Sequence, residues 1–238
     1  LGREQEMLEI MGLKSIDDLF SDIPEEIRSK GPLPLPGPQS EEEIVRDANK
    51  LLGTNVDLDC RPSFLSAGLA RNFVPSMVPM IATRGEFLTS YTPYQPEVSQ
   101  GMLQAMWEFQ TMISELVQLP ISNVSMYDAS TSAAEAITCA VRVKSKKVEK
   151  PNTVFISELV PPHRMSVIHN YTQGVGIEII KLPHREDGLL DLEKASLASG
   201  SCAVYVEQPN SFGILDEGLI RLREIVGEKT AIIVGVDV

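Results

Sequence analysis

The chain has 238 residues, of which 43% are hydrophobic, and its formal net charge is −12 at pH 7. This length is enough for one large domain with a sizeable core and a small appendage. The negative charge argues against nucleic acids and anionic membranes as partners, since both are polyanions. No apolar run in the sequence is long enough to span a bilayer.

Cysteine and histidine usage indicates neither a disulfide framework nor a metal site. The cysteines, Cys60, Cys139 and Cys202, are odd in number and widely spaced, which suits reduced thiols in a cytosol. The histidines show no ligand spacing with cysteines or acids, so we expect no bound metal. The first residues have neither a signal-peptide apolar region nor the composition of a transit peptide. We therefore expect a cytoplasmic protein.

The beginning of the chain predicts short helices joined by an extended strap. Residues 4–11 have the pattern of a short amphipathic helix that Gly12 can end. A capping box is predicted over residues 15–18. The proline-rich segment 31–38 is expected to be extended and polyproline-like, and we interpret it as a spacer between packed pieces.

A further helix is predicted directly after the strap. Ser40 and Glu43 form a second capping box, and Gly53 is the expected C′ glycine. Five apolar positions of this helix are expected to face inward: Ile44, Val45, Ala48, Leu51 and Leu52. We expect residues 1–60 to form an N-terminal helical arm of the kind that builds subunit contacts, and residues 61–238 to belong to a large α/β domain.

The stretch from Ser90 to Gly101 is rich in proline and tyrosine. Pro93 and Pro96 fix φ and bias their preceding residues towards extended conformations. The result is a stiff, extended segment with few backbone hydrogen-bond donors. Apolar residues recur at helical spacing over 102–117, which predicts a long buried helix with Ser99 as its N-cap. A loop held this firmly either lines a site or is a connector whose tyrosines pack on the core. Both interpretations stay open on the residues alone.

A helix is expected over 75–84, and another begins near residue 133. Small hydroxyl residues, Ser130, Thr131 and Ser132, precede the second helix. Free N–H groups, hydroxyls and the positive end of the helix dipole could hold a phosphate there. Asp128 argues against this, because a carboxylate beside the pocket repels an anion. Ordinary N-capping of a buried helix is the simpler interpretation.

From residue 153 onward, short β-branched runs alternate with helical segments. Strands are expected at 153–156, 177–180, 203–206 and 231–236, and helices at 164–171 and 217–226. This alternation predicts βαβ units, an α/β fold class and a mainly parallel sheet. The basic run 142–150 is interpreted as a solvated face near a helix C-terminus, with docking of an acidic partner as the alternative.

Several segments carry specific motifs: Tyr91–Gly101 (YTPYQPEVSQG), Phe109–Thr111, Met126–Ala136, Pro209–Gly213 and Ile16–Phe20. Together they resemble the glycine decarboxylases, the P-proteins of the glycine cleavage system, and within them the alpha chains (subunit 1) of two-chain forms. The resemblance covers nearly the whole chain. It implies a pyridoxal-phosphate-dependent transferase fold of the aspartate aminotransferase type (fold type I), whose small C-terminal domain this chain does not contain.

The resemblance also implies an activity. Glycine is decarboxylated, and the remaining aminomethyl group passes to the lipoyl group of the H-protein. Pyridoxal phosphate is held by a partner beta subunit (subunit 2) in a heterotetramer, and this chain alone is expected to be inactive. The alternatives are a non-catalytic scaffold subunit, and a self-sufficient pyridoxal-phosphate-dependent aminotransferase or lyase of the same fold.

The proline- and tyrosine-rich loop is the segment that this resemblance favours for chemistry. We expect five of its side chains to project towards the cofactor of the beta chain or to line the lipoyl channel: Tyr91, Thr92, Tyr94, Gln95 and Glu97. Tyrosine hydroxyls and amide groups there could hold the carboxylate of glycine.

The resemblance also bears on contact with a cofactor. Pro161 stands where cofactor-binding chains of this fold often have a histidine that stacks on the pyridine ring, and His163, two positions on, is interpreted as a capping or surface histidine. By the same resemblance, Asp237 matches the acid that pairs with the pyridine nitrogen in active chains, and we interpret it as a relic in this chain. Ser130, Thr131 and Ser132 are the phosphate candidates. Pro161 and Asp128 support a chain that does not itself bind the cofactor.

Overall fold

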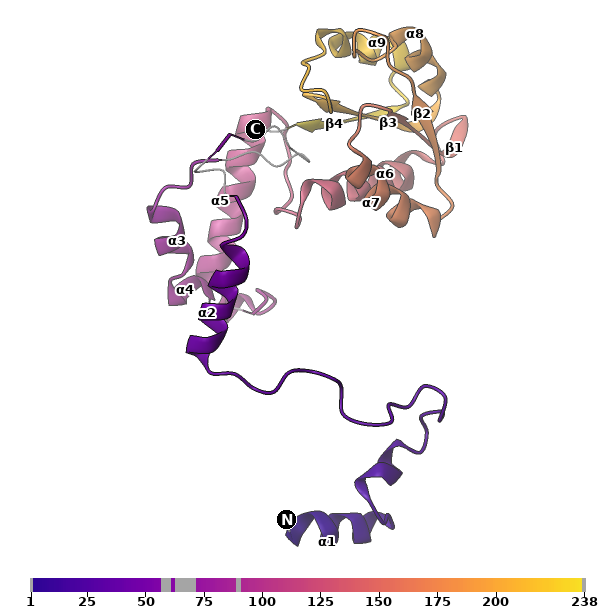
Figure 1. The fold of residues 1–238 in the computed structure, drawn as a ribbon. Helices are drawn as coiled ribbons and strands as arrows, with labels where there is room; N and C mark the ends of the chain where they lie inside the picture. Colours follow the sequence, from indigo (N-terminus) through magenta and orange to yellow (C-terminus); the bar gives the residue numbers. More distant parts are fainter. Residues whose placement is uncertain (1, 57–60, 63–71, 89–90, 237–238) are drawn as a thin grey trace. The chain divides into compact units, whose positions relative to one another are not determined.

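The computed structural model describes residues 2–56, 61–62, 72–88 and 91–236. The chain divides into two compact units, residues 1–65 and 66–238 (Figure 1). Cys60 and Asp237, which the sequence singled out, lie outside the described residues. Within the described part of the chain, no helix is long and apolar enough to cross a membrane.

The first unit contains α1 (Gly2–Met11), the 3₁₀-helix η1 (Ile16–Phe20) and α2 (Glu41–Leu52). Gly12 ends α1 with φ +72°, a conformation that glycine adopts without steric cost. Both predicted capping boxes are present, at the start of η1 and at the start of α2. The caps form because a side-chain oxygen and a nearby acid satisfy N–H groups that the first helical turn leaves free.

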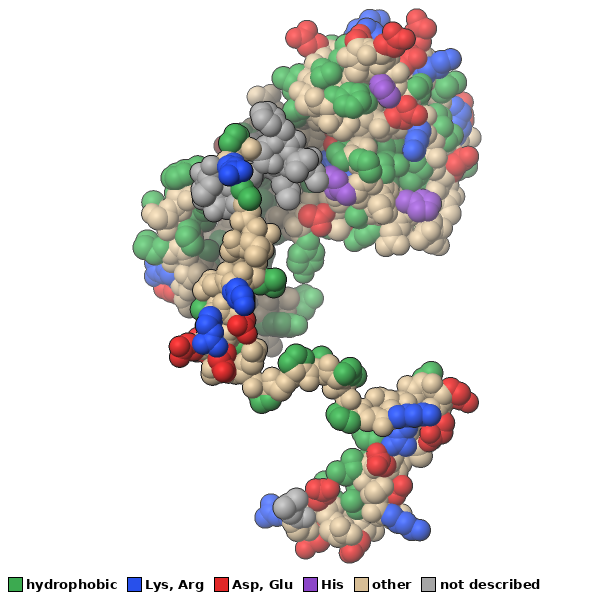
Figure 2. Space-filling view, in the orientation of Figure 1, with side chains coloured by type: hydrophobic (Ala, Val, Ile, Leu, Met, Phe, Trp, Pro, Cys, Tyr) green, Lys and Arg blue, Asp and Glu red, His purple; other side chains and the backbone are tan. Residues whose placement is uncertain are grey.

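The predicted burial of α2 is wrong. Its apolar residues are exposed: Ile44 and Val45 are 52% accessible, and Leu51 is 72% accessible. Gly53 closes the helix in the right-handed region, with φ −64°, and is not the left-handed C′ glycine that we expected. Helical spacing identifies the apolar face of a helix but not the surface that covers it. Figure 2 shows further hydrophobic side chains on the surface of this unit.

The second unit begins with α3 (Met77–Ala82), α4 (Gly85–Leu88), the 3₁₀-helix η2 (Pro96–Val98) and α5 (Gln100–Val117). The helix expected over 75–84 forms as the shorter α3, and α4 follows it beyond the expected range. Pro79 lies in the first turn of α3, where its missing N–H has no partner to lose.

Helix α5 forms where its spacing predicted, but it is not the buried helix that we expected. None of its residues is buried. Ser99 occupies the N-cap position, yet its hydroxyl donates to the carbonyl oxygen of Gln95 at 2.6 Å and does not cap the helix. Gln118 ends α5 in the left-handed region, with φ +55°.

The rest of the second unit is an α/β sandwich. The strands β1 (Lys150–Ser157), β2 (Glu178–Leu182), β3 (Ser201–Gln208) and β4 (Ala231–Val236) pair in parallel in the order β2-β1-β3-β4. This confirms the predicted α/β fold class with a parallel sheet. The strands are long apolar runs because both faces of the sheet are covered.

Helices cover both faces of this sheet (Figure 1). Helices α6 (Ala129–Lys144) and α7 (Pro162–Gln173) pack on one face, against Val154 and Ile156 of β1. The opposite face carries α8 (Leu192–Ala195), η3 (Ser196–Ala198), η4 (Glu217–Arg221) and α9 (Leu222–Val226). Phe155 points to that second face, because successive side chains of a strand alternate.

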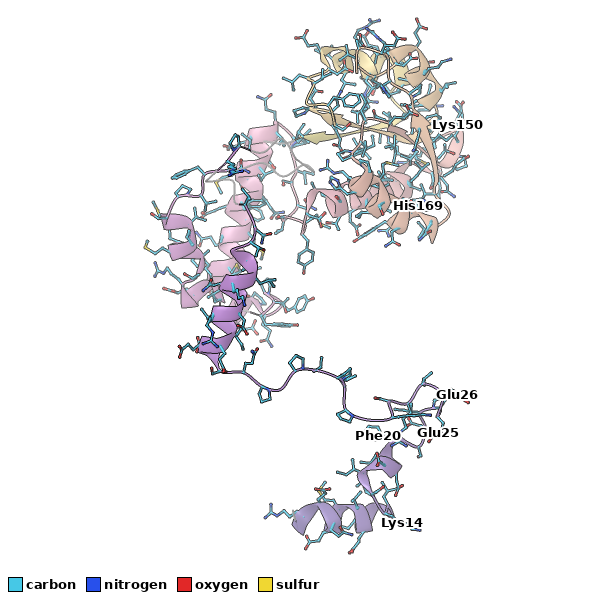
Figure 3. All side chains as sticks on the ribbon, in the orientation of Figure 1. Lys14, Phe20, Glu25, Glu26, Lys150 and His169 are labelled. Carbon is cyan, nitrogen blue, oxygen red and sulfur yellow. The ribbon has the colours of Figure 1, made fainter. Side chains whose placement is uncertain are left out.

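The order of the strands fixes where a site can form. From β1 the chain crosses to β2 on one side and then returns to β3 on the other side. The connections therefore diverge at the carboxyl ends of β1 and β3, which leaves a crevice between them. Lys150 lies at the amino end of β1, at the opposite edge of the sheet. Its Nζ donates to the carbonyl oxygens of Leu197 and Ser199 at 2.6 Å and 3.1 Å, which ties β1 to the segment before β3. Figure 3 labels Lys150 at the start of β1.

Candidate functional site

A cavity of about 780 Å³ opens at the carboxyl edge of the sheet. Its walls are the first turns of α6 and α7, the ends of β3 and β4, and the loop of residues 209–213 that follows β3. This is the position at which ligands bind in open parallel sheets. All of these walls belong to the α/β sandwich, so the cavity is formed within one packed body.

A buried ion pair lies in the cavity wall. Arg164 Nη1 is 2.7 Å from Glu207 Oε1, and the side chains are only 19% and 6% exposed. The hydroxyl of Tyr205 donates to the same oxygen at 3.0 Å. Burial opposes the charge of Arg164, but the hydrogen bond and charge of Glu207 raise the pKa of its guanidinium above the ordinary value. Burial, reinforced by the charge of Glu207, raises the pKa of the Tyr205 hydroxyl, which therefore stays protonated.

The position of Arg164 is unfavourable by local criteria. It lies in the first turn of α7, close to the positive end of the helix dipole. Its Nε is buried and has no hydrogen-bond partner among the residues that the structure describes. An unsatisfied buried donor costs about 1–3 kcal/mol. Glu207, at the end of β3, is what compensates this cation.

The floor of the cavity admits no side chain at residue 235. A Cβ atom built on Gly235 would lie 2.7 Å from the hydroxyl oxygen of Tyr205 and 3.2 Å from Cγ of Glu207. Glycine at this position therefore lets β4 pass close to the ion-pair network.

The loop after β3 is held by an asparagine. Asn210 Nδ2 donates to the carbonyl oxygen of Gly188 at 2.8 Å, and its Oδ1 accepts from the N–H groups of Phe212 and Ile214 at 2.9 Å and 3.2 Å. These bonds occupy the carbonyl oxygen of the amide and one of its two N–H donors. Asn210 thus holds the loop that forms the cavity rim.

The start of α6 is capped by Asp128. Its Oδ1 accepts from the N–H groups of Ser130 and Thr131 at 2.7 Å and 2.8 Å, and its carbonyl oxygen accepts from the N–H of Ser132 at 3.0 Å. This is the ordinary N-capping that the sequence favoured over phosphate binding. Of the hydroxyl residues, Ser132 lines the cavity. The N–H groups of Ser130, Thr131 and Ser132 are thus already bonded to Asp128, which also adds a negative charge at this helix end.

Replacing Asp128 with alanine is expected to lower the free energy of unfolding by about 1 kcal/mol, because the helix loses the acceptor for its free N–H groups. Asparagine at the same position keeps an acceptor and is expected to retain most of the stability. Urea unfolding of both variants measures this difference. Equal stability of the alanine variant and the unchanged chain would contradict the capping role.

The structure places the other predicted residues as follows. Pro161 lines the cavity beside Arg164, whereas His163 is exposed and is not among the lining residues. The rings of Tyr91 and Tyr94 are 99% and 87% exposed. The alternative in which these tyrosines pack on the core of the chain is therefore wrong.

The sequence did not single out Arg164 or Glu207. One signal for Glu207 was present, because it is a carboxylate at the end of an otherwise apolar strand, where functional groups of parallel sheets gather. For Arg164 the sequence offered only its place behind two prolines at the start of a helix. Among the residues that the structure describes, no group of histidines, cysteines and acids could hold a metal ion.

Comparisons with known proteins identify the family. The family described as "Glycine cleavage system P-protein" matches residues 2–238. Proteins named "Probable glycine dehydrogenase (decarboxylating) subunit 1" are similar throughout. The one from Thermococcus onnurineus is 44% identical over 98% of this chain and 51% of its own length, and the one from Oceanobacillus iheyensis is 42% identical over 97% and 51%. The chain thus spans about half the length of the curated relatives it matches.

A solved structure is also similar. It is the crystal structure of glycine decarboxylase (P-protein) of the glycine cleavage system in inhibitor-bound form. The match has a TM-score of 0.74 and 36% sequence identity, and it covers 98% of this chain and 51% of that one. The α/β sandwich described above is therefore the fold of these proteins. On this evidence the chain belongs to the glycine cleavage system P-protein family.

Proposed function

We propose that this chain is the alpha-type part of a glycine decarboxylase that acts together with a partner chain, subunit 2. The observation that carries the proposal is the identity of 42–44% to proteins named subunit 1 along almost the whole chain. The assembled enzyme decarboxylates glycine and passes the aminomethyl group to the lipoyl group of the H-protein. We place this assembly in the cytoplasm.

The cavity of this chain does not fit pyridoxal phosphate. The N–H groups of Ser130 and Thr131 in the first turn of α6 are bonded to Asp128, and the charge of Arg164 is compensated by Glu207. The described lining of the cavity contains no lysine that could bind the cofactor covalently. Pro161 stands where a ring-stacking residue is expected. These features support a cofactor held by the partner subunit, and we derive no catalytic step in this cavity.

We place the contribution of this chain to catalysis in the loop of residues 91–98. Its backbone is braced, because the N–H of Tyr94 donates to the carbonyl oxygen of Thr92 at 2.9 Å and that of Val98 donates to Gln95 at 3.2 Å. The tyrosine rings are exposed on this rigid support. The side chains proposed to complete an active site at the subunit interface are Tyr91, Thr92, Tyr94, Gln95 and Glu97. A hydroxyl held in this way can donate to the carboxylate of glycine.

Replacing Tyr94 with phenylalanine is expected to lower turnover of the assembled enzyme by about ten- to a hundredfold, the effect of one lost hydrogen bond to a charged group. The assembly should remain intact, because the ring is kept. Steady-state kinetics and size-exclusion chromatography measure the two properties. Tyr127, whose ring is also fully exposed, provides the matched control Tyr127→Phe. Unchanged turnover of the Tyr94 variant would assign this residue to packing at the interface.

We also propose that residues 1–60 form an arm that packs on the partner subunit. Apolar side chains of this segment are exposed, including Ile10 at 86% and Leu51 at 72%. Exposed apolar residues at helical spacing are typical of surfaces that become covered on association. This observation also suits the second candidate function, a scaffold subunit without a catalytic side chain. Single substitutions in the 91–98 loop separate the two, since a scaffold would show effects on assembly alone.

Exchange of carbon between glycine and bicarbonate tests the proposed activity. We expect exchange when this chain, extended to the full length of its relatives, is combined with subunit 2 and pyridoxal phosphate. A self-sufficient enzyme of the same fold would show exchange without the partner.

A further inference from the structure

We propose that Ser99 is a positioning residue whose buried hydroxyl holds the loop of residues 91–98 in the geometry that the reaction needs. In this role Ser99 acts through the backbone of Gln95 and does not itself touch the substrate. The inference rests on the function proposed above, which places catalytic side chains on this loop.

The burial of Ser99 sets it apart from its surroundings. Among the described residues of this part of the chain, 72–88 and 91–128, Ser99 is the only buried one. It is 5% exposed, whereas the apolar side chain of Val98 beside it is 73% exposed. A hydroxyl that is shielded from water needs a hydrogen-bond partner in the protein. That partner is the carbonyl oxygen of Gln95, to which Ser99 Oγ donates at 2.6 Å.

Helix α5 loses an N-cap through this arrangement. Serine is among the most favourable N-cap residues, and it caps with an extended backbone and an accepting side-chain oxygen. Ser99 has φ −137° and ψ 23° instead, and its side chain makes no capping bond to the helix. Natural proteins break such local rules mainly at functional sites. The hydroxyl therefore serves the loop and not the helix.

The loop has a physical need for a side-chain donor. Pro93 and Pro96 have no backbone N–H, so two positions of the loop cannot donate a hydrogen bond. The carbonyl oxygen of Gln95 accepts from the N–H of Val98 at 3.2 Å and from the hydroxyl of Ser99 at the shorter distance of 2.6 Å. The side chain of Ser99 thus supplies the closer of the two bonds that fix this turn.

Ser99 also joins the loop to a rigid support. Its N–H donates to the carbonyl oxygen of Pro96 at 3.3 Å, and its own carbonyl oxygen accepts from the N–H of Leu103 in α5 at 2.9 Å. The loop is therefore tied to the start of an 18-residue helix through one residue. A displacement of about 1 Å in a catalytic group can reduce the rate a hundredfold, so a bond that fixes the backbone of such a group affects turnover without contacting the substrate.

Hydrogen exchange measured by mass spectrometry tests whether Ser99 holds the loop. The sample is this chain extended to the full length of its relatives, without partner or cofactor. In Ser99→Ala we expect amide exchange over residues 94–99 to be about three- to tenfold faster, the effect of one lost hydrogen bond. Ser114→Ala is the matched control, since Ser114 is a half-buried serine of the same helix. It should leave exchange in the loop unchanged.

Two further variants separate positioning from capping. Aspartate is a good N-cap, but its carboxylate accepts hydrogen bonds and cannot donate to Gln95. Ser99→Asp should therefore loosen the loop as much as Ser99→Ala, whereas Ser99→Thr keeps the donor and should protect the loop. Protection in Ser99→Asp equal to that of the unchanged chain would assign Ser99 to capping and overturn the inference. Unchanged exchange in Ser99→Ala would overturn it as well.

Turnover in the assembled enzyme tests whether the reaction uses this geometry. With subunit 2 and pyridoxal phosphate, we expect glycine–bicarbonate exchange to fall about ten- to hundredfold in the alanine and aspartate variants and to be restored in the threonine variant. A loosened loop with full turnover would overturn the inference. Absence of exchange with the unchanged chain would contradict the proposed function instead, and the hydrogen-exchange result would still decide whether Ser99 holds the loop.

Discussion

Replacing Glu207 with alanine is expected to lower the free energy of unfolding by about 3–5 kcal/mol, the usual cost of removing one partner of a buried ion pair. The substitution leaves the guanidinium of Arg164 in the cavity wall without its counter-charge and removes the acceptor of the Tyr205 hydroxyl. Both side chains of the pair are well shielded from water, so the solvent cannot replace the lost contact in full.

Urea unfolding followed by circular dichroism measures this loss. The matched control is Glu149→Ala, which removes an exposed pair with Lys229 at 3.8 Å and should change stability by less than about 1 kcal/mol. A double variant, Arg164→Met with Glu207→Leu, removes both charges together and should recover much of the lost stability. A similar small effect of Glu207→Ala and Glu149→Ala would contradict the burial of the pair.

Replacing Ile137 with alanine is the second large change, with an expected loss of about 2–5 kcal/mol. Ile137 is fully buried on α6 and belongs to the core cluster that this helix forms with α7 and one face of the sheet. Removing its side chain deletes apolar contact and leaves a cavity that the strands cannot fill, because a close-packed sheet relaxes little.

Ile220 offers a matched control, because it is the same residue type in η4 and is 88% exposed. Ile220→Ala should change stability by less than about 0.5 kcal/mol. In urea unfolding we expect Ile137→Ala to shift the midpoint with little change in slope. If both isoleucine variants unfold at the same urea concentration, the packing of α6 against the sheet is not as described.

Much of the α/β sandwich follows from the sequence. The β-branched runs predicted the strands because a strand covered on both faces has to be apolar throughout. The predicted segment 231–236 matches β4, and 203–206 lies within β3. The strands extend further than the apolar runs because polar residues at their ends still pair with neighbouring backbones. Their parallel order followed from the helices between them.

Burial was predicted less well than secondary structure. The apolar faces of α2 and α5 were expected to be covered, but Leu51 and Leu116 are more than half exposed. Periodicity identifies the side of a helix that avoids water, and the covering surface depends on parts of the protein that are distant in sequence or on other chains. The same limit applies to the tyrosine-rich loop, whose stiffness followed from its prolines but whose contacts did not.

The ion pair in the cavity wall could not be predicted for a related reason. Arg164 follows β1 and Glu207 ends β3, and they meet only because these strands are neighbours in the sheet. The sequence did indicate that Asp128 disfavours phosphate binding, since a cap and a repulsive charge both follow from local position. The capping role of Asp128 could thus be predicted from neighbouring residues in the sequence. The pairing of Arg164 with Glu207 could be predicted only from the order of the strands in the sheet.

We propose that this chain is part of subunit 1 of a glycine decarboxylase, which needs a partner subunit for activity. Exchange of labelled bicarbonate into glycine tests it most directly, using the chain extended to the full length of its relatives, subunit 2 and pyridoxal phosphate, separately and mixed. We predict exchange in the mixture and none with either chain alone. Exchange by this chain alone would contradict the partner-held cofactor, and no exchange in the mixture would contradict the proposed activity.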